Sequence, residues 1–327
     1  MIGTKLSITV RLIISIGLLV FAWVVIGGAE TLARFAHVKT EWVILAVALS
    51  VPQIIISAQR WRFTAARLGA QLGAKDSIAE YYVSTFVNQV VPGGVTGDVL
   101  RAWRHVRRTP EHGVPWGRIA RAVFFERAAG QVVLLIVMAA GIATWPAAIG
   151  TAPPSWLVPA IGILGGVTIL VIAIGRVVHR LRSKGGETAV GRFVADAKAA
   201  LLSPRVLPAQ LGMSSLIVAS YLITYWCCGK ALGTDIPIIT VITVVPAVLM
   251  AMLLPVSIAG WGLREMAAAA LWPLAGMSAA DGIAIATLYG LVVLAGSLPG
   301  AIFVRRSGKV ELEQNVLAHG DRSTGRP

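Results

Sequence analysis

The chain has 327 residues, of which 56% are hydrophobic and only 13% are charged. Soluble domains carry about 25% charged residues, so this composition cannot cover a soluble globular surface. It argues against a soluble enzyme, a disordered protein or a nucleic-acid-binding protein. The net charge of +14 does not change this conclusion, because the basic residues lie between apolar runs, as they do in membrane proteins. We therefore expect an all-α polytopic membrane protein.

Apolar runs long enough to span a bilayer, about 17–25 residues, recur along the chain. Charge-free runs of this kind cover 12–29, 42–59, 128–145, 156–175, 206–229, 236–263 and 283–304. A further charge-free run, 81–97, is less hydrophobic and has proline and glycine near its end. Together with the charge pattern, these runs predict about six full transmembrane helices and two segments that do not cross.

The arginines and lysines of the connecting segments predict the orientation. They accumulate in 58–75, 101–121 and 176–205 and again after residue 304, whereas 146–155 carries no charge. Because Lys and Arg resist translocation, the basic segments and both termini are predicted to be cytoplasmic. The expected location is the plasma (inner) membrane.

This orientation leaves two segments that cannot cross the membrane once. Residues 76–108 begin and end beside cytoplasmic segments, and residues 236–272 begin and end on the outer side. Each is therefore predicted to be a re-entrant hairpin, and the two hairpins enter from opposite sides. Non-helical backbone at membrane depth is tolerated only where protein or a watery cavity covers it.

The predicted topology can be checked by chemical labelling. Single cysteines are placed at His112, Gly150, Gly185 and Met277 in a chain without its two native cysteines. We expect an impermeant thiol reagent to label only positions 150 and 277 in intact cells, since the basic segments are cytoplasmic. Labelling at position 112 or 185 would contradict the arrangement with two hairpins.

The two predicted hairpins share a sequence pattern. Residues 92–101 and 255–264 both read Pro-x-small-aliphatic-small-Gly-x-x-Leu-Arg. Each hairpin also lies between two predicted spans, so residues 41–178 and 206–305 are predicted to be the halves of an inverted repeat. Opposed, interrupted segments in corresponding positions are typical of transporters whose site lies near the midplane of the membrane.

Candidate site residues lie at the two breaks and at the start of the helix that follows the first. Glycines permit positive φ and close backbone approach, and the start of a half-helix favours anions through its free N–H groups. Two such breaks with two arginines suit a phosphate group. The candidates for substrate binding are Asn88, Gln89, Pro92, Gly93, Gly94, Gly97, Asp98, Arg101, Glu126, Arg127, Ser257, Gly260, Trp261, Arg264 and Glu265.

The charged candidates need partners at membrane depth. Arg264 follows a long uncharged run, and a charge there is costly unless it is paired. We expect its partner to be Glu126, Asp98 or a bound phosphate rather than Glu265, because neighbouring side chains on a helix do not face each other. An alternative role for Glu126 is a structural ion pair with Arg101 or Arg104, or proton coupling.

Asp98 and Arg101 each have a structural and a functional interpretation. Asp98 follows Gly97 and is expected either to cap the returning half-helix or to contact substrate. Arg101 is either an interfacial arginine that follows the positive-inside rule or part of the site. We expect Arg101 and Arg264, each nine residues after a proline, to hold one anionic headgroup together.

The sequence indicates no catalytic constellation. The five histidines are scattered without metal-ligand spacing, and neither a phosphate-binding Gly-rich loop nor a nucleophile elbow occurs. We therefore predict no catalytic residue, no metal site and no cofactor.

Three motifs in order carry a resemblance to a known family. Residues 88–101, 126–130 and 254–265 resemble the flippase-like membrane domain of lysylphosphatidylglycerol synthases, and the likeness extends over about residues 10–305. The resemblance implies one transmembrane domain, residues 1–305. It also implies a flippase or transporter that moves an anionic phospholipid or an isoprenoid-phosphate-linked lipid. Membrane lipids are the expected partners, and nucleic acid is not.

The full-length synthases also carry a soluble aminoacyl-transferase domain. Here only the polar residues 306–327 follow, which we expect to be a disordered cytoplasmic tail, so the resemblance implies lipid handling rather than an enzyme. Two alternatives stay open. One is a membrane-embedded enzyme that acts on a lipid phosphate with Glu126 or Asp98 as acid or base, and the other is a non-transporting partner of a lipid synthase.

Overall fold

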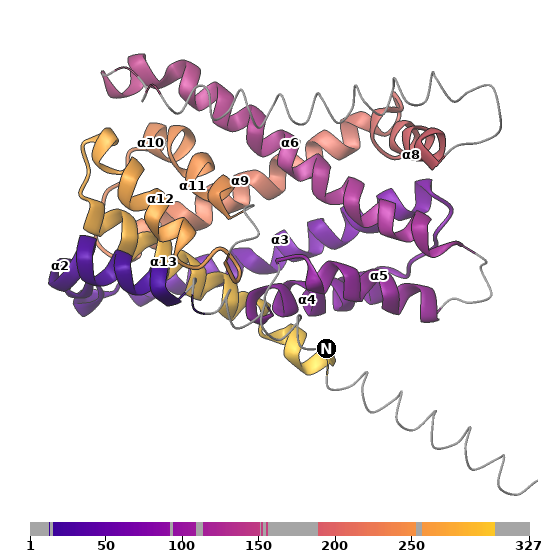
Figure 1. Ribbon diagram of the computed structural model, residues 1–327, viewed down its shortest axis with the longest axis horizontal. Coiled ribbons are helices and arrows are strands. Elements are labelled where there is room, and N and C mark those ends of the chain that lie inside the picture. The colour runs from indigo at the N-terminus through magenta and orange to yellow at the C-terminus, as the bar shows by residue number, and fades with distance from the viewer. Residues whose placement is uncertain are drawn as a thin grey trace, which may run out of the picture.

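The computed structural model describes residues 13, 16–91, 94–108, 114–150, 152, 155, 189–252 and 257–304. Every regular element in these ranges is a helix, which confirms the predicted all-α membrane fold (Figure 1). Within the described residues, four helices have the length and apolar composition to cross a membrane. They are α3 (Thr40–Arg67), α6 (Trp116–Ile149), α9 (Leu207–Ala231) and α13 (Ala279–Ser297).

A fifth span is formed if the bent segment near the N-terminus counts as one crossing. It comprises Ile16–Val24 and Gly28–His37 and contains η1 (Ala22–Gly27), α2 (Gly28–Arg34) and η2 (Phe35–His37), and it packs against α13. The predicted span 156–175 lies outside the described residues. The described helices α8 (Ala189–Ala197) and η4 (Lys198–Leu202) precede α9.

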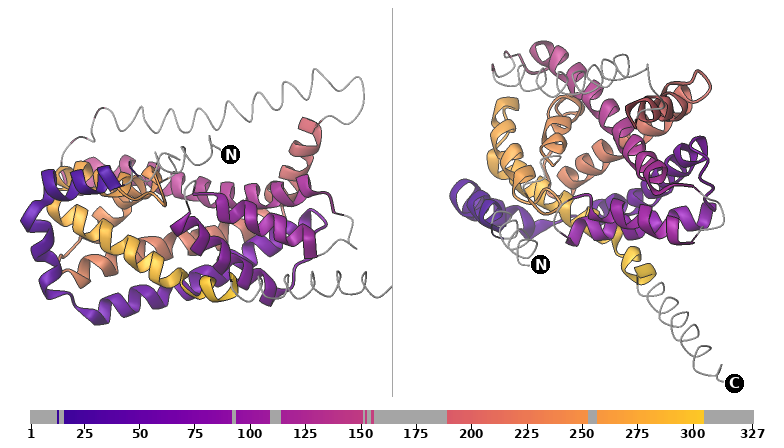
Figure 2. Two further views of the ribbon diagram at one scale, coloured as in Figure 1. Left: turned by 60° about the horizontal axis from the view of Figure 1, so that its bottom comes forward. Right: turned by 45° about the vertical axis from the view of Figure 1, so that its right-hand side comes forward.

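Two units of short helices separate the long ones. Between α3 and α6, the chain forms α4 (Ala74–Val90) and α5 (Thr96–Arg108), which pack against each other. Between α9 and α13 it forms α10 (Ile238–Thr243), α11 (Val245–Ala251), α12 (Leu263–Leu271) and η5 (Pro273–Ala275). Figures 1 and 2 place these two units toward opposite ends of the bundle. The order of long helix, broken short helices and long helix thus occurs twice.

The helices extend further into the basic segments than the charge pattern predicts. Helix α3 continues to Arg67 and ends where Gly69 adopts a φ of +81°, whereas the apolar run stops at residue 59. Helix α5 likewise contains residues 101–108, which we expected to lie in a loop. The predicted spans end at the first charged residue. A helix ends only where the backbone leaves the helical conformation, and a charged side chain can remain in a helix if it has a partner.

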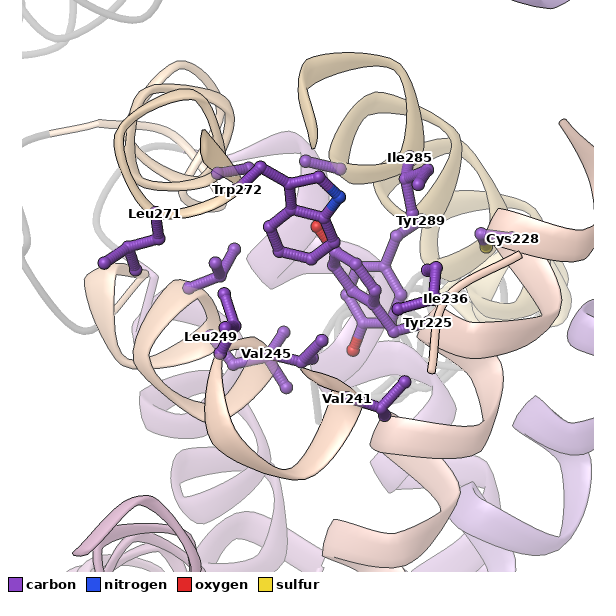
Figure 3. Packing of buried hydrophobic residues seen from close by; sticks show 14 of the residues in the cluster. Tyr225, Cys228, Ile236, Val241, Val245, Leu249, Leu271, Trp272, Ile285 and Tyr289 are labelled. Atoms are coloured by element: carbon purple, nitrogen blue, oxygen red, sulfur yellow. The ribbon is translucent and has the colours of Figure 1, made fainter. Parts of the chain in front are cut away.

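The apolar core lies where α9, α13 and the second unit of short helices meet. Figure 3 shows the rings of Tyr225, Trp272 and Tyr289 packed together among aliphatic side chains. The ring centroids of Tyr225 and Tyr289 are 5.3 Å apart, and those of Tyr225 and Trp272 are 5.6 Å apart. On the other side, α10 lies directly on α6, where a Cβ at Gly141 would come within 2.7 Å of the Thr243 backbone. The core therefore fixes the second unit against three long helices.

Helix α5 has a charged buried face, and its exposed face is apolar as far as Trp103, beyond which Arg107 is exposed and lies over the Trp103 ring. Val95 just before it, and Val99 and Trp103 within it, are spaced by four residues and are all exposed. The opposite face carries the buried side chains of Asp98, Arg101, Arg104 and His105. This distribution is the reverse of that in a soluble protein, and it positions charged side chains inside the helix bundle.

Candidate functional site

A buried network of charges joins α3, α5 and α6, and we call it the first cluster. Arg60 donates from Nη2 and Nε to Glu126 Oε1 at 2.5 and 3.2 Å, and Arg101 Nη2 donates to Glu126 Oε2 at 2.8 Å. Arg60 Nη1 also donates to Ser214 Oγ of α9 at 2.9 Å. Arg101 and Glu126 are fully buried and Arg60 is nearly so. The predicted pairing of Glu126 with Arg101 is thus present.

A second carboxylate, that of Asp98, extends the first cluster. Arg101 Nη2 lies 2.9 Å from Asp98 Oδ1, and Arg127 Nη2 lies 2.6 Å from Oδ2. Ser84 and Asn88 of α4 donate to the same carboxylate at 3.2 Å each. The described contacts show these side chains on the oxygens of Asp98, and both of its interpretations, a capping role and a substrate contact, stay predictions.

The break between α4 and α5 brings these side chains together. The backbone N–H of Gly97 donates to Asn88 Oδ1 at 2.8 Å, so Asn88 caps the returning helix. A Cβ at Gly97 would overlap the backbone carbonyl of Ser84, and Gly94 has a φ of +63°. Only glycine allows this approach and this turn at low cost, which confirms the expected reason for the glycines.

Aromatic rings enclose the arginine at the centre of the first cluster. The Arg101 guanidinium lies 4.8 Å from the Trp61 ring and 4.6 Å from the Tyr81 ring, and the Tyr81 hydroxyl donates to Glu126 Oε1 at 3.2 Å. Such cation–π contacts stabilise a desolvated cation by roughly 2 kcal/mol or more. The rings hold Arg101 in place without neutralising its charge.

The first cluster has more positive charge and more donors than its acceptors use. The guanidinium groups of Arg60, Arg101 and Arg127 face only two carboxylates, those of Glu126 and Asp98. Among the described residues, Arg101 Nε and Nη1, Arg127 Nε and Trp61 Nε1 are buried without an acceptor. The side chain of Arg127 is 41% exposed, so it connects the buried cluster with the surroundings of the helix bundle. This arrangement can accept an anion.

The second break carries an arginine with a different partner from the one expected. Arg264 Nη2 lies 2.6 Å from Glu265 Oε1, and both side chains are buried. The expectation that these neighbours do not meet is wrong. Glu265 lies in the first turn of α12, where its other oxygen accepts the Gly262 N–H at 2.7 Å, and this bond orients the carboxylate so that Arg264 can fold back onto it.

Aromatic side chains also surround this second cluster, which we define as Trp261, Arg264, Glu265 and Tyr289. The Arg264 guanidinium lies 5.0 Å from the Trp261 ring and 5.6 Å from the Tyr289 ring. A Cβ at Gly290 would overlap that guanidinium, so this glycine gives the arginine its space beside α13. Arg264 Nε has no acceptor among the described residues.

The structure places the other candidates as follows. Gly260 has a φ of +78° and lies against Met252, and the Ser257 hydroxyl is buried without a partner in the described part of the chain. No polar contact joins Gln89 to the first cluster among the described residues. Pro92, Gly93 and Pro255 lie outside those residues.

Arg101 and Arg264 belong to separate clusters. They have no partner in common among the described residues, and their helices lie toward opposite ends of the bundle in Figure 1. Sequence reasoning also missed Arg60, which it assigned to a cytoplasmic loop. The available signal was the lack of any proline or glycine between the apolar run and Gly69, which favours a helix that continues through Arg60.

The comparison with protein families agrees with the resemblance found in the sequence. The family described as the lysylphosphatidylglycerol synthase TM region matches residues 8–300, and the chain belongs to this family. No curated protein and no solved structure matches the chain. Family membership supports a function connected with membrane lipids.

Proposed function

We propose that this member of the lysylphosphatidylglycerol synthase membrane-region family is a flippase or transporter for a lipid with an anionic headgroup, either a phospholipid or an isoprenoid-phosphate-linked lipid. The proposal places α4–α5 and α10–α12 as the two re-entrant hairpins, one from each side of the membrane. The headgroup would pass through the helix bundle while the acyl or isoprenoid chains stay in the bilayer.

The observation that carries this proposal is the surplus of arginine donors in the first cluster. Arg101 uses only one of its nitrogens for the two carboxylates, and its other nitrogens are buried without an acceptor among the described residues. A buried donor without a partner costs about 1–3 kcal/mol, more for a charged group. An anionic headgroup would satisfy these donors, and arginine matches phosphate oxygens with two parallel hydrogen bonds.

The alternative of an enzyme that acts on a lipid phosphate receives less support. Glu126 is held by Arg60 and Arg101, and Asp98 by Arg101 and Arg127. Both oxygens of each carboxylate thus already accept from guanidinium groups, so neither carboxylate is directed at a substrate. No group of three or more His, Cys, Asp or Glu in the described residues could hold a metal ion. We therefore favour translocation without chemical change.

Reconstitution of Arg127→Gln into proteoliposomes tests the proposal. We expect the variant to move fluorescent phosphatidylglycerol about tenfold more slowly than the unmodified protein, since it loses a charged contact at the exposed edge of the first cluster. Arg34→Gln is the matched control. Arg34 is 44% exposed and also pairs with one aspartate, Asp281, at 2.8 Å, but it belongs to neither cluster.

Several outcomes would contradict the proposal. Equal transport by both variants would show that Arg127 does not meet the headgroup. Equal transport of phosphatidylcholine and phosphatidylglycerol would exclude selection of an anionic headgroup. Recovery of a chemically altered lipid would favour the enzyme, and transport only after addition of a lipid synthase would favour the non-transporting partner.

A further inference from the structure

A row of polar side chains follows one face of α9. Gln210, Ser214, Tyr221 and Tyr225 are separated by four, seven and four residues, which places them along one stripe of the helix. Ser214 accepts the hydrogen bond from Arg60, so this stripe touches the first cluster. Most other positions of α9 are apolar, as expected for a helix that crosses a membrane.

Tyr221 lies between the two clusters. Before it on the same stripe, Ser214 accepts a hydrogen bond from Arg60 of the first cluster. After it, Tyr225 packs on Tyr289 of α13, whose ring lies 5.6 Å from the Arg264 guanidinium of the second cluster. The helical rise puts Tyr221 ~10 Å beyond Ser214 along the axis. Along α9, Tyr221 thus lies between the residue bonded to the first cluster and the residue packed on the second.

Tyr225 continues the stripe by one turn, and its hydroxyl is an unusual feature of the core. The residue is fully buried, its ring packs on Tyr289 and Trp272, and its hydroxyl has no hydrogen-bond partner among the described residues (Figure 3). Phenylalanine would fill the same space without an unpaired hydroxyl, so packing alone does not explain tyrosine at this position.

We propose that Tyr221 and Tyr225 are positioning residues on the path of the headgroup. Their hydroxyls donate in turn to its anionic oxygens as the headgroup moves from the first cluster to the second. This inference rests on the proposed function and deepens it, because the headgroup would bind at the two clusters in succession and not at Arg101 and Arg264 together. The first step of this movement lies between Ser214 and Tyr221. The second step lies between Tyr225 and the pair of Tyr289 and Arg264.

The experiment removes the hydroxyls and keeps the rings. Tyr221→Phe and Tyr225→Phe are reconstituted in vesicles of phosphatidylcholine with phosphatidylglycerol. The readouts are the transport rate of fluorescent phosphatidylglycerol, the phosphatidylglycerol retained after purification, and the melting temperature. Tyr82→Phe is the control, because Tyr82 is also a buried tyrosine but its ring packs against Phe303 and it belongs to neither cluster.

We expect each test variant to slow transport about tenfold, because a hydrogen bond to a charged group is lost during passage. Retained phosphatidylglycerol should be unchanged, since the first cluster stays intact, and the melting temperature of Tyr225→Phe should be unchanged or higher. Tyr82→Phe should match the unmodified protein in all three measurements.

The failure of this inference differs from the failure of the proposed function. If the unmodified protein moves no phosphatidylglycerol, the proposed function fails. If it does, and both test variants transport at the same rate, the path along α9 is wrong. A loss of transport with a matching fall in melting temperature or in retained lipid would also overturn the inference, because it would assign the tyrosines a structural role.

Discussion

Glu126→Gln is expected to destabilise the protein by about 3–5 kcal/mol, because it leaves buried arginine charge without its partner. Glu126 is fully buried and holds both Arg60 and Arg101. Glutamine keeps the shape of the side chain, so the effect comes from charge and not from a cavity. The measurement is the free energy of unfolding in detergent, with tryptophan fluorescence as the signal that reports unfolding.

The control and the rescue variant separate this cause from a general loss of charge. Asp235→Asn removes the exposed carboxylate that pairs with Lys230, and exposed pairs contribute little, so we expect no measurable change. Adding Arg60→Gln to Glu126→Gln should recover part of the stability, since Arg101 still has Asp98. If Glu126→Gln unfolds at the same denaturant concentration as the unmodified protein, the first cluster does not hold the bundle together.

Gly97→Ala is expected to cost about 1–3 kcal/mol of stability and to abolish most transport, because the added Cβ has no space. It would overlap the backbone carbonyl of Ser84, which cannot rotate away as a side chain could. Helices α4 and α5 must then separate, and Asp98 moves away from Ser84 and Asn88. The measurements are the unfolding free energy and phosphatidylglycerol transport in proteoliposomes.

Gly212→Ala serves as the comparison within a membrane helix. Gly212 lies in α9, and nothing lies within 4 Å of a Cβ built there. Because alanine favours a helix over glycine by about 1 kcal/mol, this variant should be as stable as the unmodified protein or more stable. Equal behaviour of the two alanine variants would show that the close approach of α4 and α5 is not required.

The sequence predicted part of the first cluster. The glycines marked the break, and one interpretation of Glu126 was an ion pair with Arg101 or Arg104, of which the pair with Arg101 is present. That these residues bind a headgroup stays a prediction. The hydrophobic and charged runs also indicated the long helices α3, α6, α9 and α13, since a span depends on length and polarity.

The details that the sequence did not provide depend on how far side chains reach in three dimensions. Arg60 joins the first cluster only because α3 continues beyond its apolar run, and Ser214 becomes its partner only when α9 packs against α3. The pair of Arg264 and Glu265 contradicts the rule for neighbours on a regular helix, because the rule does not describe a first turn where the carboxylate also binds the backbone N–H of Gly262.

The reversed faces of α5 change which substitutions count as conservative. On a soluble protein, replacing an exposed valine such as Val99 by a charged residue is usually harmless, and replacing a buried arginine such as Arg101 by leucine suits the interior. In α5 the exposed valine is suited to hydrocarbon, and the buried arginine to a polar centre. Tolerance scales drawn from soluble proteins therefore rank substitutions in this helix in the opposite order, and redesign for solubility would have to treat its outer face as an interior.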